Sequence, residues 1–178
     1  YKLPGNLFKL RVRAKSPVVG LTIDDISLRA TFDVNIINIT PHNNGKSDFH
    51  PAPDYVLNVN DVLIVQGKGN DVGRAAAFWN LVMMANEPIK EGDLISNEVG
   101  IAEVLLRQRS TLQGKTLADI RFGSSYRLTV LDIIRAGVQG KLDLKTTPLK
   151  FGDILLVQGE WKDIFALKRL RRDFIVTG

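Results

Sequence analysis

Only a few groups of residues in this chain have the types and spacing that chemistry would need. His42 and His50 share one stretch rich in proline, glycine and asparagine, without the third ligand that a metal site requires. Asp24 and Asp25 are neighbours, and because adjacent residues of a helix do not share a face, they fit a helix start better than an acid–base pair. The chain has no cysteine, and no nucleophile has a matched base. The sequence therefore predicts no catalytic site and no metal site.

A glycine-rich turn at residues 67–73 is the one motif that suggests a nucleotide. Gly67, Gly69 and Gly73 follow an apolar strand and open a helix, as in a dinucleotide-binding turn. That motif also needs a parallel strand–helix–strand unit with an acidic residue about 20 positions on. Here the helix runs into Asn-Glu-Pro88. We interpret the stretch as a plain strand-to-helix turn, with a nicotinamide-dependent oxidoreductase as the weaker alternative.

The elements that position these residues occur twice. Residues 153–159 (Asp-Ile-Leu-Leu-Val-Gln-Gly) repeat residues 61–67 (Asp-Val-Leu-Ile-Val-Gln-Gly) at an offset of 92. Upstream, Ser110 repeats Ser16 at an offset of 94, and matching Gly, Thr, Asp and Ile follow in register. This period is longer than the about 20–50 residues of solenoid repeats, so it indicates duplicated domains. We place the first domain at 1–86, a polar linker at 87–100 and the second domain at 101–178.

Hydrophobic periodicity predicts the same order of elements in both domains. Thr22, with Asp25 three residues on, predicts a capped short helix. The fold class is α+β: two similar small domains, each a mainly antiparallel sheet with two helices, packed as a pseudo-twofold pair. Because small domains bury thin cores, we expect these domains to pack on each other or on a second chain. In the first domain we expect strands at 7–15, 34–39 and 61–66, a loop or loose hairpin at 41–54, and a helix from about 71 to Ala85. In the second we expect strands at 101–109, 128–135, 153–158 and 174–176, and helices at 116–121 and 161–170.

Charge and composition limit the partners. The net charge is +5, but aromatic residues are sparse and the basic residues are scattered, so nucleic acid is not an expected partner. The chain starts at Tyr1 without an initiator Met, which suggests a piece of something longer. Basic residues gather only near the C-terminal end, where they suit a segment beside anionic lipid or a merely solvated helix face. They are Lys162, Lys168, Arg169, Arg171 and Arg172.

Three segments of the second domain together resemble a known family. They are Gly114-Lys-Thr-Leu-Ala-Asp-Ile120, Tyr126-Arg-Leu-Thr-Val-Leu-Asp-Ile-Ile-Arg135 and Gly152-Asp-Ile-Leu-Leu-Val-Gln-Gly159. The combination is similar to the C-terminal domain of RCK/TrkA proteins (RCK_C or TrkA-C), regulators of potassium conductance and uptake. Two such domains in tandem resemble the soluble insert of bacterial transporters of the divalent-anion:sodium symporter family. The first domain departs from the pattern at Asn60, where glycine is usual.

The resemblance implies a regulatory domain pair on the cytoplasmic face of the cell membrane, without enzymatic activity. Its implied partners are the membrane-spanning part of the same polypeptide, a second copy in a homodimer and a small effector. No cofactor is implied. The alternatives are a purely structural dimerisation scaffold and an RCK-type regulatory subunit of a potassium transporter.

The resemblance also implies a ligand site. In RCK_C domains that bind cyclic di-AMP, the corresponding residues face the nucleotide at a dimer interface. An arginine offers phosphate a planar fork of donors, and an asparagine can pair with a base edge. At the matching positions the second domain has Gly123, Ser124, Thr129 and Val130, which share none of these residue types. The alternative interpretation is therefore that the arginine is an ordinary surface residue and that the segment is only a helix end and a strand start. The implied site residues are Leu28, Arg29, Ala30, Asn35 and Ile36.

Overall fold

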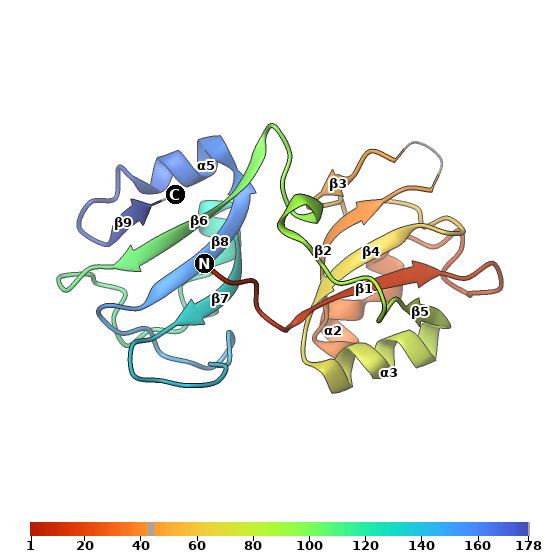
Figure 1. Cartoon of the computed structure of the whole chain (residues 1–178), viewed down its shortest axis with the longest axis horizontal. Helices are drawn as coiled ribbons and strands as arrows, with labels where there is room; N and C mark the ends of the chain where they lie inside the picture. Colours follow the sequence, from red (N-terminus) through yellow and green to blue (C-terminus); the bar gives the residue numbers. More distant parts are fainter. Residues whose placement is uncertain (43–44, 178) are drawn as a thin grey trace. The chain divides into compact units, whose positions relative to one another are not determined.

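The computed structural model describes residues 1–42 and 45–177. They form two compact units, which we call the first unit (residues 5–90) and the second unit (residues 1–4 and 91–178) (Figure 1). The predicted loop at 41–54 includes Asn43 and Asn44, which lie outside the described residues. Because the two units are compact in themselves, each is described on its own. The domain limits at 86 and 100, and the packing of the domains as a pseudo-twofold pair, stay predictions.

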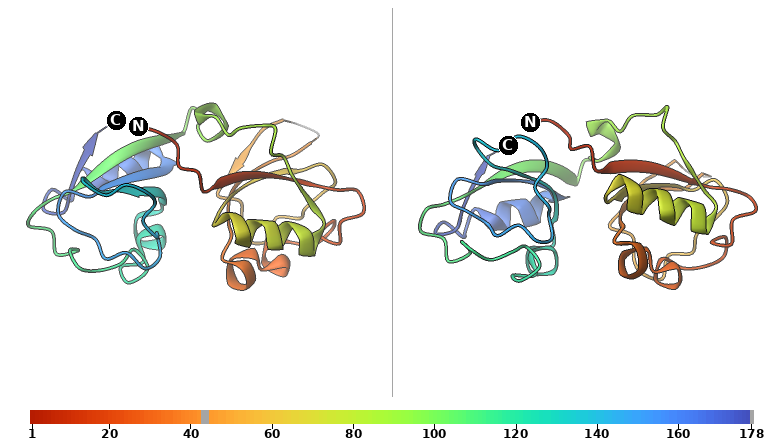
Figure 2. Two further views of the ribbon diagram at one scale, coloured as in Figure 1. Left: turned by 60° about the horizontal axis from the view of Figure 1, so that its bottom comes forward. Right: turned by 90° about the horizontal axis from the view of Figure 1, so that it is seen from below.

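The first unit is an antiparallel sheet with its helices on one face (Figure 2). The strand order across the sheet is β3-β2-β4-β1-β5. The strands are β1 (Leu7–Val12), β2 (Asn35–Thr40), β3 (Asp48–Phe49), β4 (Val62–Gln66) and β5 (Leu81–Met83). The helices are α1 (Ile23–Ile26), α2 (Leu28–Phe32) and α3 (Gly69–Trp79).

The second unit repeats this topology. Its order β7-β8-β6-β9 corresponds strand by strand to β2-β4-β1-β5, with antiparallel pairing throughout. The register shift between Ile36 and Asn38 recurs between Val130 and Asp132. The α+β class and the duplication are therefore confirmed. The strands are β6 (Val99–Leu106), β7 (Thr129–Ile134), β8 (Ile154–Glu160) and β9 (Phe174–Thr177), and the helices are η1 (Glu91–Asp93), α4 (Phe122–Tyr126) and α5 (Trp161–Leu167).

Each unit has its own apolar core. Side chains alternate between the faces of a strand, so every second residue of the central strands points toward the helices. In the first unit Leu10, Leu63 and Val65 are fully buried beside Val72 of α3. The second unit buries its counterparts in the same way. Its cluster includes Val104, Leu155, Val157 and Ile164.

Two helix predictions were wrong. The helix expected to reach Ala85 ends at Trp79, because Asn80 takes a left-handed conformation (φ 54°) and the chain continues as β5, paired with β1. The helix expected at 116–121 is a series of turns, and the helix forms instead at Phe122–Tyr126. Left-handed Arg121 (φ 50°) and Arg127 (φ 58°) bound it.

In each unit an aromatic ring fills the contact between the first strand and the last helix, but the ring belongs to the helix in the second unit and to the strand in the first. In the second unit the Trp161 ring of α5 lies on Gly100 of β6, where an added Cβ would be 2.0 Å from the ring. The equivalent helix position in the first unit is Gly69, and the ring beside it belongs to Phe8 of β1, at 3.8 Å from an added Cβ. An aromatic ring lies at this contact in both units, but the element that carries it differs.

Candidate functional site at the α2–β2 junction

The predicted site residues lie where α2 turns into β2, and a capped first turn positions them. The Asp25 backbone N–H donates to Thr22 Oγ1 (3.1 Å), and the Thr22 N–H donates to Asp25 Oδ2 (3.0 Å). Hydrogen bonding to the Thr22 backbone N–H, and then to the Thr22 side chain, lowers the pKa of the Asp25 carboxyl. Ser27, in a left-handed conformation (φ 47°), ends α1 and starts α2. The predicted helix start at Thr22 is confirmed.

A tight turn then joins α2 to β2 above a glycine. Asp33 is left-handed (φ 59°), and its N–H donates to the carbonyl of Arg29 at 3.1 Å. Gly67, at the end of β4, faces this turn: a Cβ there would lie 3.4 Å from the Asp33 carbonyl oxygen and 3.3 Å from a Val34 methyl group. Gly159 faces the equivalent turn of the second unit, more tightly. The repeated glycine after the Gln of each strand therefore allows helix–turn–strand and sheet to approach closely.

The side chains at the junction differ in exposure. Arg29 and Ala30 are exposed, and Asn35 and Ile36 are half-buried, on one continuous helix–turn–strand segment. Leu28 is only 3% exposed and belongs to the core, where it holds α2 against the sheet. Among the described residues, the side chains of Arg29 and Asn35 have no hydrogen-bond or ion-pair partner. A guanidinium and an amide are thus free to bind a ligand.

An exposed aromatic side chain lies next to this segment. Phe78 of α3 is 66% exposed, and its ring centroid is 5.7 Å from that of Phe32 at the end of α2. The buried side of α3 is formed by Val72, Ala75 and Ala76, so Phe78 lies outside the apolar stripe of its helix. Sequence reasoning missed Phe78, although its place outside that stripe was a usable signal. A large apolar ring in water suggests a contact with a ligand or another protein surface.

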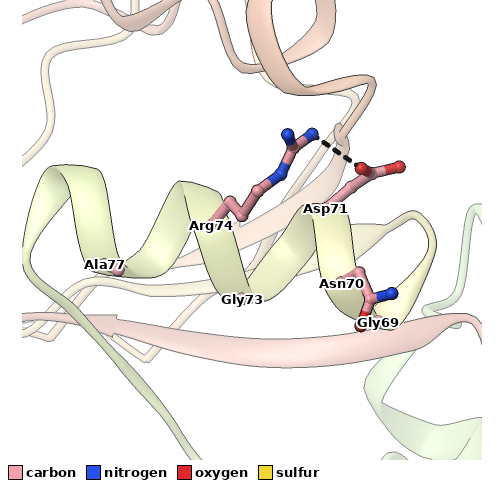
Figure 3. A pocket seen from close by; sticks show the side chains of 6 residues that line it. All are labelled: Gly69, Asn70, Asp71, Gly73, Arg74 and Ala77. Atoms are coloured by element: carbon pink, nitrogen blue, oxygen red, sulfur yellow. Dashed lines mark hydrogen bonds and ion pairs between the residues drawn. The ribbon is translucent and has the colours of Figure 1, made fainter.

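The glycine-rich turn forms an open hollow along α3 (Figure 3). Within it, Arg74 Nη2 lies 2.9 Å from Asp71 Oδ1. The strand that follows α3 is β5, which pairs antiparallel with β1. The parallel unit that a dinucleotide turn needs is therefore not formed here. The hollow is lined by Gly69, Asn70, Asp71, Gly73, Arg74 and Ala77.

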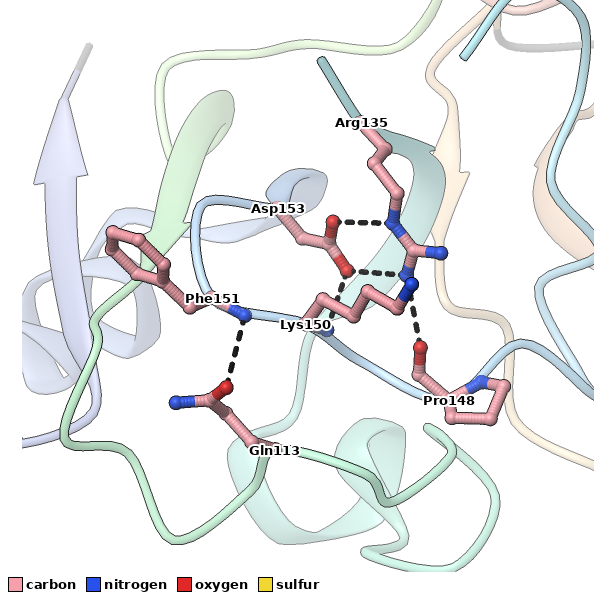
Figure 4. A network of polar contacts seen from close by, with 6 residues as sticks. All are labelled: Gln113, Arg135, Pro148, Lys150, Phe151 and Asp153. Atoms are coloured by element: carbon pink, nitrogen blue, oxygen red, sulfur yellow. Dashed lines mark hydrogen bonds and ion pairs between the residues drawn. The ribbon is translucent and has the colours of Figure 1, made fainter. Parts of the chain in front are cut away.

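The repeated aspartate of the two matching strands closes a turn. Asp153 is buried, and its carboxylate accepts hydrogen bonds from Arg135 Nε and Nη2, each at 2.8 Å, and from the Lys150 N–H at 2.8 Å (Figure 4). These bonds raise the pKa of the Arg135 guanidinium. In the first unit Asp61 accepts from the Tyr55 hydroxyl (3.1 Å) and the Asn58 N–H (2.9 Å). Both aspartates are structural: each accepts the N–H of the residue three positions earlier, whereas the side-chain partner differs between the units.

Neither a metal site nor a membrane-spanning helix was found in the described parts of the chain. Residues 1–42 and 45–177 contain no group of three His, Cys, Asp or Glu side chains placed to hold a metal ion. No helix within the same residues has both the length and the apolar character to cross a bilayer. His50 lies beside β3 with a left-handed backbone (φ 53°).

Residues 7–78 match the TrkA-C domain family. The chain is 32% identical over 192 residues to "Uncharacterized transporter YfbS" of Escherichia coli (strain K12), an alignment that covers 98% of this chain and 29% of the relative. It is 23% identical to "Probable sodium/sulfate cotransporter 3" of Chlamydomonas reinhardtii, over 83% of this chain and 16% of the relative. The chain thus spans less than a third of the length of these transporters.

Among solved structures, the potassium transport protein KtrA RCK C domain in complex with c-di-AMP aligns with 38% of this chain and 75% of its own, at 31% identity and a TM-score of 0.35. The family match lies entirely within the first unit, and the second unit repeats its strand order. Residues 7–78 are therefore similar to the TrkA-C domain family, and the second unit repeats their strand order.

Proposed function

We propose that this chain is the paired regulatory region of a sodium-coupled anion transporter and lies on the cytoplasmic face of the membrane. The observation that carries the proposal is the alignment of nearly the whole chain, 98%, with 29% of a transporter, together with the TrkA-C match. The similarity to a probable sodium/sulfate cotransporter supports the sodium-coupled anion class. A region of this size leaves most of the relative's length for the membrane-spanning part. That part is the first partner we propose.

The α2–β2 junction of the first unit is the proposed effector site, and cyclic di-AMP is the first candidate ligand. The exposed Arg29 guanidinium would bind phosphate through its fork of donors, and the Asn35 amide would pair with a base edge. Ala30 and Ile36 would supply apolar contact, and Leu28 would hold α2 in place from the core. The effector would favour one arrangement of the domains over another and so shift a population, without chemistry.

Thermal melting of the chain with and without cyclic di-AMP tests this site. A ligand at 100 times its Kd stabilises the native state by about 2.7 kcal/mol, which corresponds to a rise of several degrees in Tm. Arg29→Ala should abolish the rise. Arg13→Ala is the matched control. The junction lies at the end of the sheet where Gln66 pairs with Asn35, whereas Arg13 follows β1 at the opposite end. An equal loss in both variants, or no rise in the wild type, would contradict the proposed site.

A dimerisation scaffold is the second candidate, and the exposure of Phe78 favours it. A ring that is 66% exposed beside Phe32 would be covered in a homodimer formed through α2 and α3. The mass of the chain in solution distinguishes the two candidates. A stable dimer that Phe78→Ser converts to a monomer, with no melting shift for any nucleotide, would support the scaffold and not the sensor.

A further inference from the structure

A basic surface with an apolar centre lies on the second unit, and two distant segments of the chain build it. We call it the basic surface. One segment is the loop after β6, and the other runs from the end of α5 into β9 (Figure 1). Its basic residues are Arg107, Arg109, Lys168, Arg169, Arg171 and Arg172, all exposed, and its apolar residues are Phe165 and Leu170.

Asp173 holds the two segments together. Its carboxylate oxygen Oδ1 accepts hydrogen bonds from the Ser110 hydroxyl (2.6 Å) and the Thr111 N–H (3.1 Å). Its carbonyl accepts the Arg107 N–H at 2.9 Å. The acidic side chain inside the cluster is thus occupied with neutral donors. The fold therefore adds Arg107 and Arg109 to the basic run that is visible in the sequence.

Within residues 1–42 and 45–177, the charges of this surface find no ion-pair partner. None of the six basic side chains forms an ion pair with another of the described residues. Lys168 instead places its Nζ 5.1 Å from the centroid of the Phe165 ring. Six cations without ion-pair partners on these two adjoining segments repel one another, and an anionic partner would relieve that repulsion.

Apolar side chains emerge among these cations. Phe165 is 53% exposed and stacks on Trp161 with centroids 5.8 Å apart, and Leu170 is 37% exposed. The buried residues of α5 are Ile164 and Leu167, so Phe165 lies outside the core-facing stripe of the helix. Aromatic and apolar side chains surrounded by Lys and Arg are the composition of segments that lie in a membrane interface.

We propose that the basic surface docks on the anionic headgroups of a lipid bilayer. The six cations would bind lipid phosphates, and Phe165 and Leu170 would enter the boundary between headgroups and acyl chains. Charge complementarity and the exposed apolar pair identify this occupant. The inference rests on the proposed function only for the presence of a membrane beside the chain.

Flotation of the chain with vesicles tests the proposal. Vesicles of phosphatidylcholine alone are compared with vesicles that contain about one third phosphatidylglycerol, because each Lys or Arg near an anionic surface strengthens binding about fivefold. The chain should bind only the anionic vesicles, and salt should weaken the binding. Arg171→Glu with Arg172→Glu should reduce the partition constant by at least about 25-fold. Phe165→Ser should reduce it several-fold while the salt dependence stays.

The matched control is Lys141→Glu with Lys145→Glu. It makes the same change in charge on the loop after β7, the edge strand opposite to β9. An equal loss in both double variants, or equal binding to neutral vesicles, would overturn the proposal. Binding of duplex DNA without binding of vesicles would also overturn it, since the surface would then belong to nucleic acid. The flotation assay contains no cyclic di-AMP, so a negative result there leaves the proposed effector site to be judged by the melting experiment alone.

Discussion

Replacing Arg135 by methionine should destabilise the second unit strongly. Methionine keeps much of the length of the arginine stem but removes the charge and every donor. The carboxylate of Asp153, whose side chain is 1% exposed, would lose both 2.8 Å bonds to the guanidinium and keep only the Lys150 N–H among the bonds in Figure 4. The substitution therefore leaves a buried charge without its partner.

The size of the effect follows from those contacts. A hydrogen bond to a charged group contributes about 1.5–3 kcal/mol, and breaking a buried ion pair costs about 3–5 kcal/mol. The Arg135 side chain is 17% exposed, so water can partly replace it. We expect a loss of about 3 kcal/mol, which is roughly 12–24 °C in Tm for a unit of this size.

Urea unfolding followed by tryptophan fluorescence measures this loss, because the chain has two tryptophans and each unit contains one, Trp79 and Trp161. In a Trp79→Phe background the signal reports the second unit alone. Arg109→Met is the control, since an exposed arginine without an ion pair should change the free energy of unfolding by no more than about 0.5 kcal/mol. A loss below about 1 kcal/mol in Arg135→Met would refute the reasoning.

Two further predictions concern the repeated glycine and the first unit's aspartate. Gly159→Ala should cost the second unit about 1–3 kcal/mol in the same assay, because the added Cβ would lie 2.4 Å from a Leu128 methyl group, whereas Gly92→Ala, with nothing within 4 Å, should be neutral. An equal effect at both glycines would contradict the close-approach argument. Burial, then the charge of Asp61, raises the pKa of Tyr55 from 10.0 to about 12, so its hydroxyl stays protonated in the folded chain after it ionises in the unfolded one. Its contribution to stability is complete below pH 10 and is lost as the pH rises toward 12. The pKa values of Tyr1 and Tyr126 are raised as well, so unfolding at several pH values should show a smaller alkaline decline in Tyr55→Phe than in the wild type, and an identical decline in both would rule this contribution out.

Much of the fold could be predicted because the chain repeats itself. The matching strands at 61–67 and 153–159 indicated the duplication, and Thr22 with Asp25 marked a helix start that the structure contains. The end of α3 was not predictable from propensity, since Ala-rich sequence continues toward Ala85. Asn80 stops the helix there, and pairing of Leu81–Met83 with β1 is a tertiary interaction that no local pattern reports.

The site was predictable in part. The family resemblance pointed to Arg29 and Asn35, and both lie on one helix–turn–strand segment, where Arg29 is exposed and Asn35 is half-buried. Their role in binding stays a prediction. Phe78 could not be placed beside Phe32 from spacing, because their contact depends on how α2 lies against α3. The partners of Asp153 were also hidden, since Arg135 reaches it across a loop and has no counterpart at Asp61.

The reversed origin of the aromatic ring limits how freely the two units could exchange parts. Phe8 pairs with Val65 and Ala102 pairs with the equivalent Val157, so Ala102 is the counterpart of Phe8. A graft of β6 onto the first unit would therefore place Ala102 opposite Gly69 and leave a void, because neither partner would carry a ring. A graft of α5 alone would bring two rings, Trp161 and Phe8, into space built for one. Strand and helix complement each other within each unit, so the interchangeable piece of this architecture is the strand together with its helix.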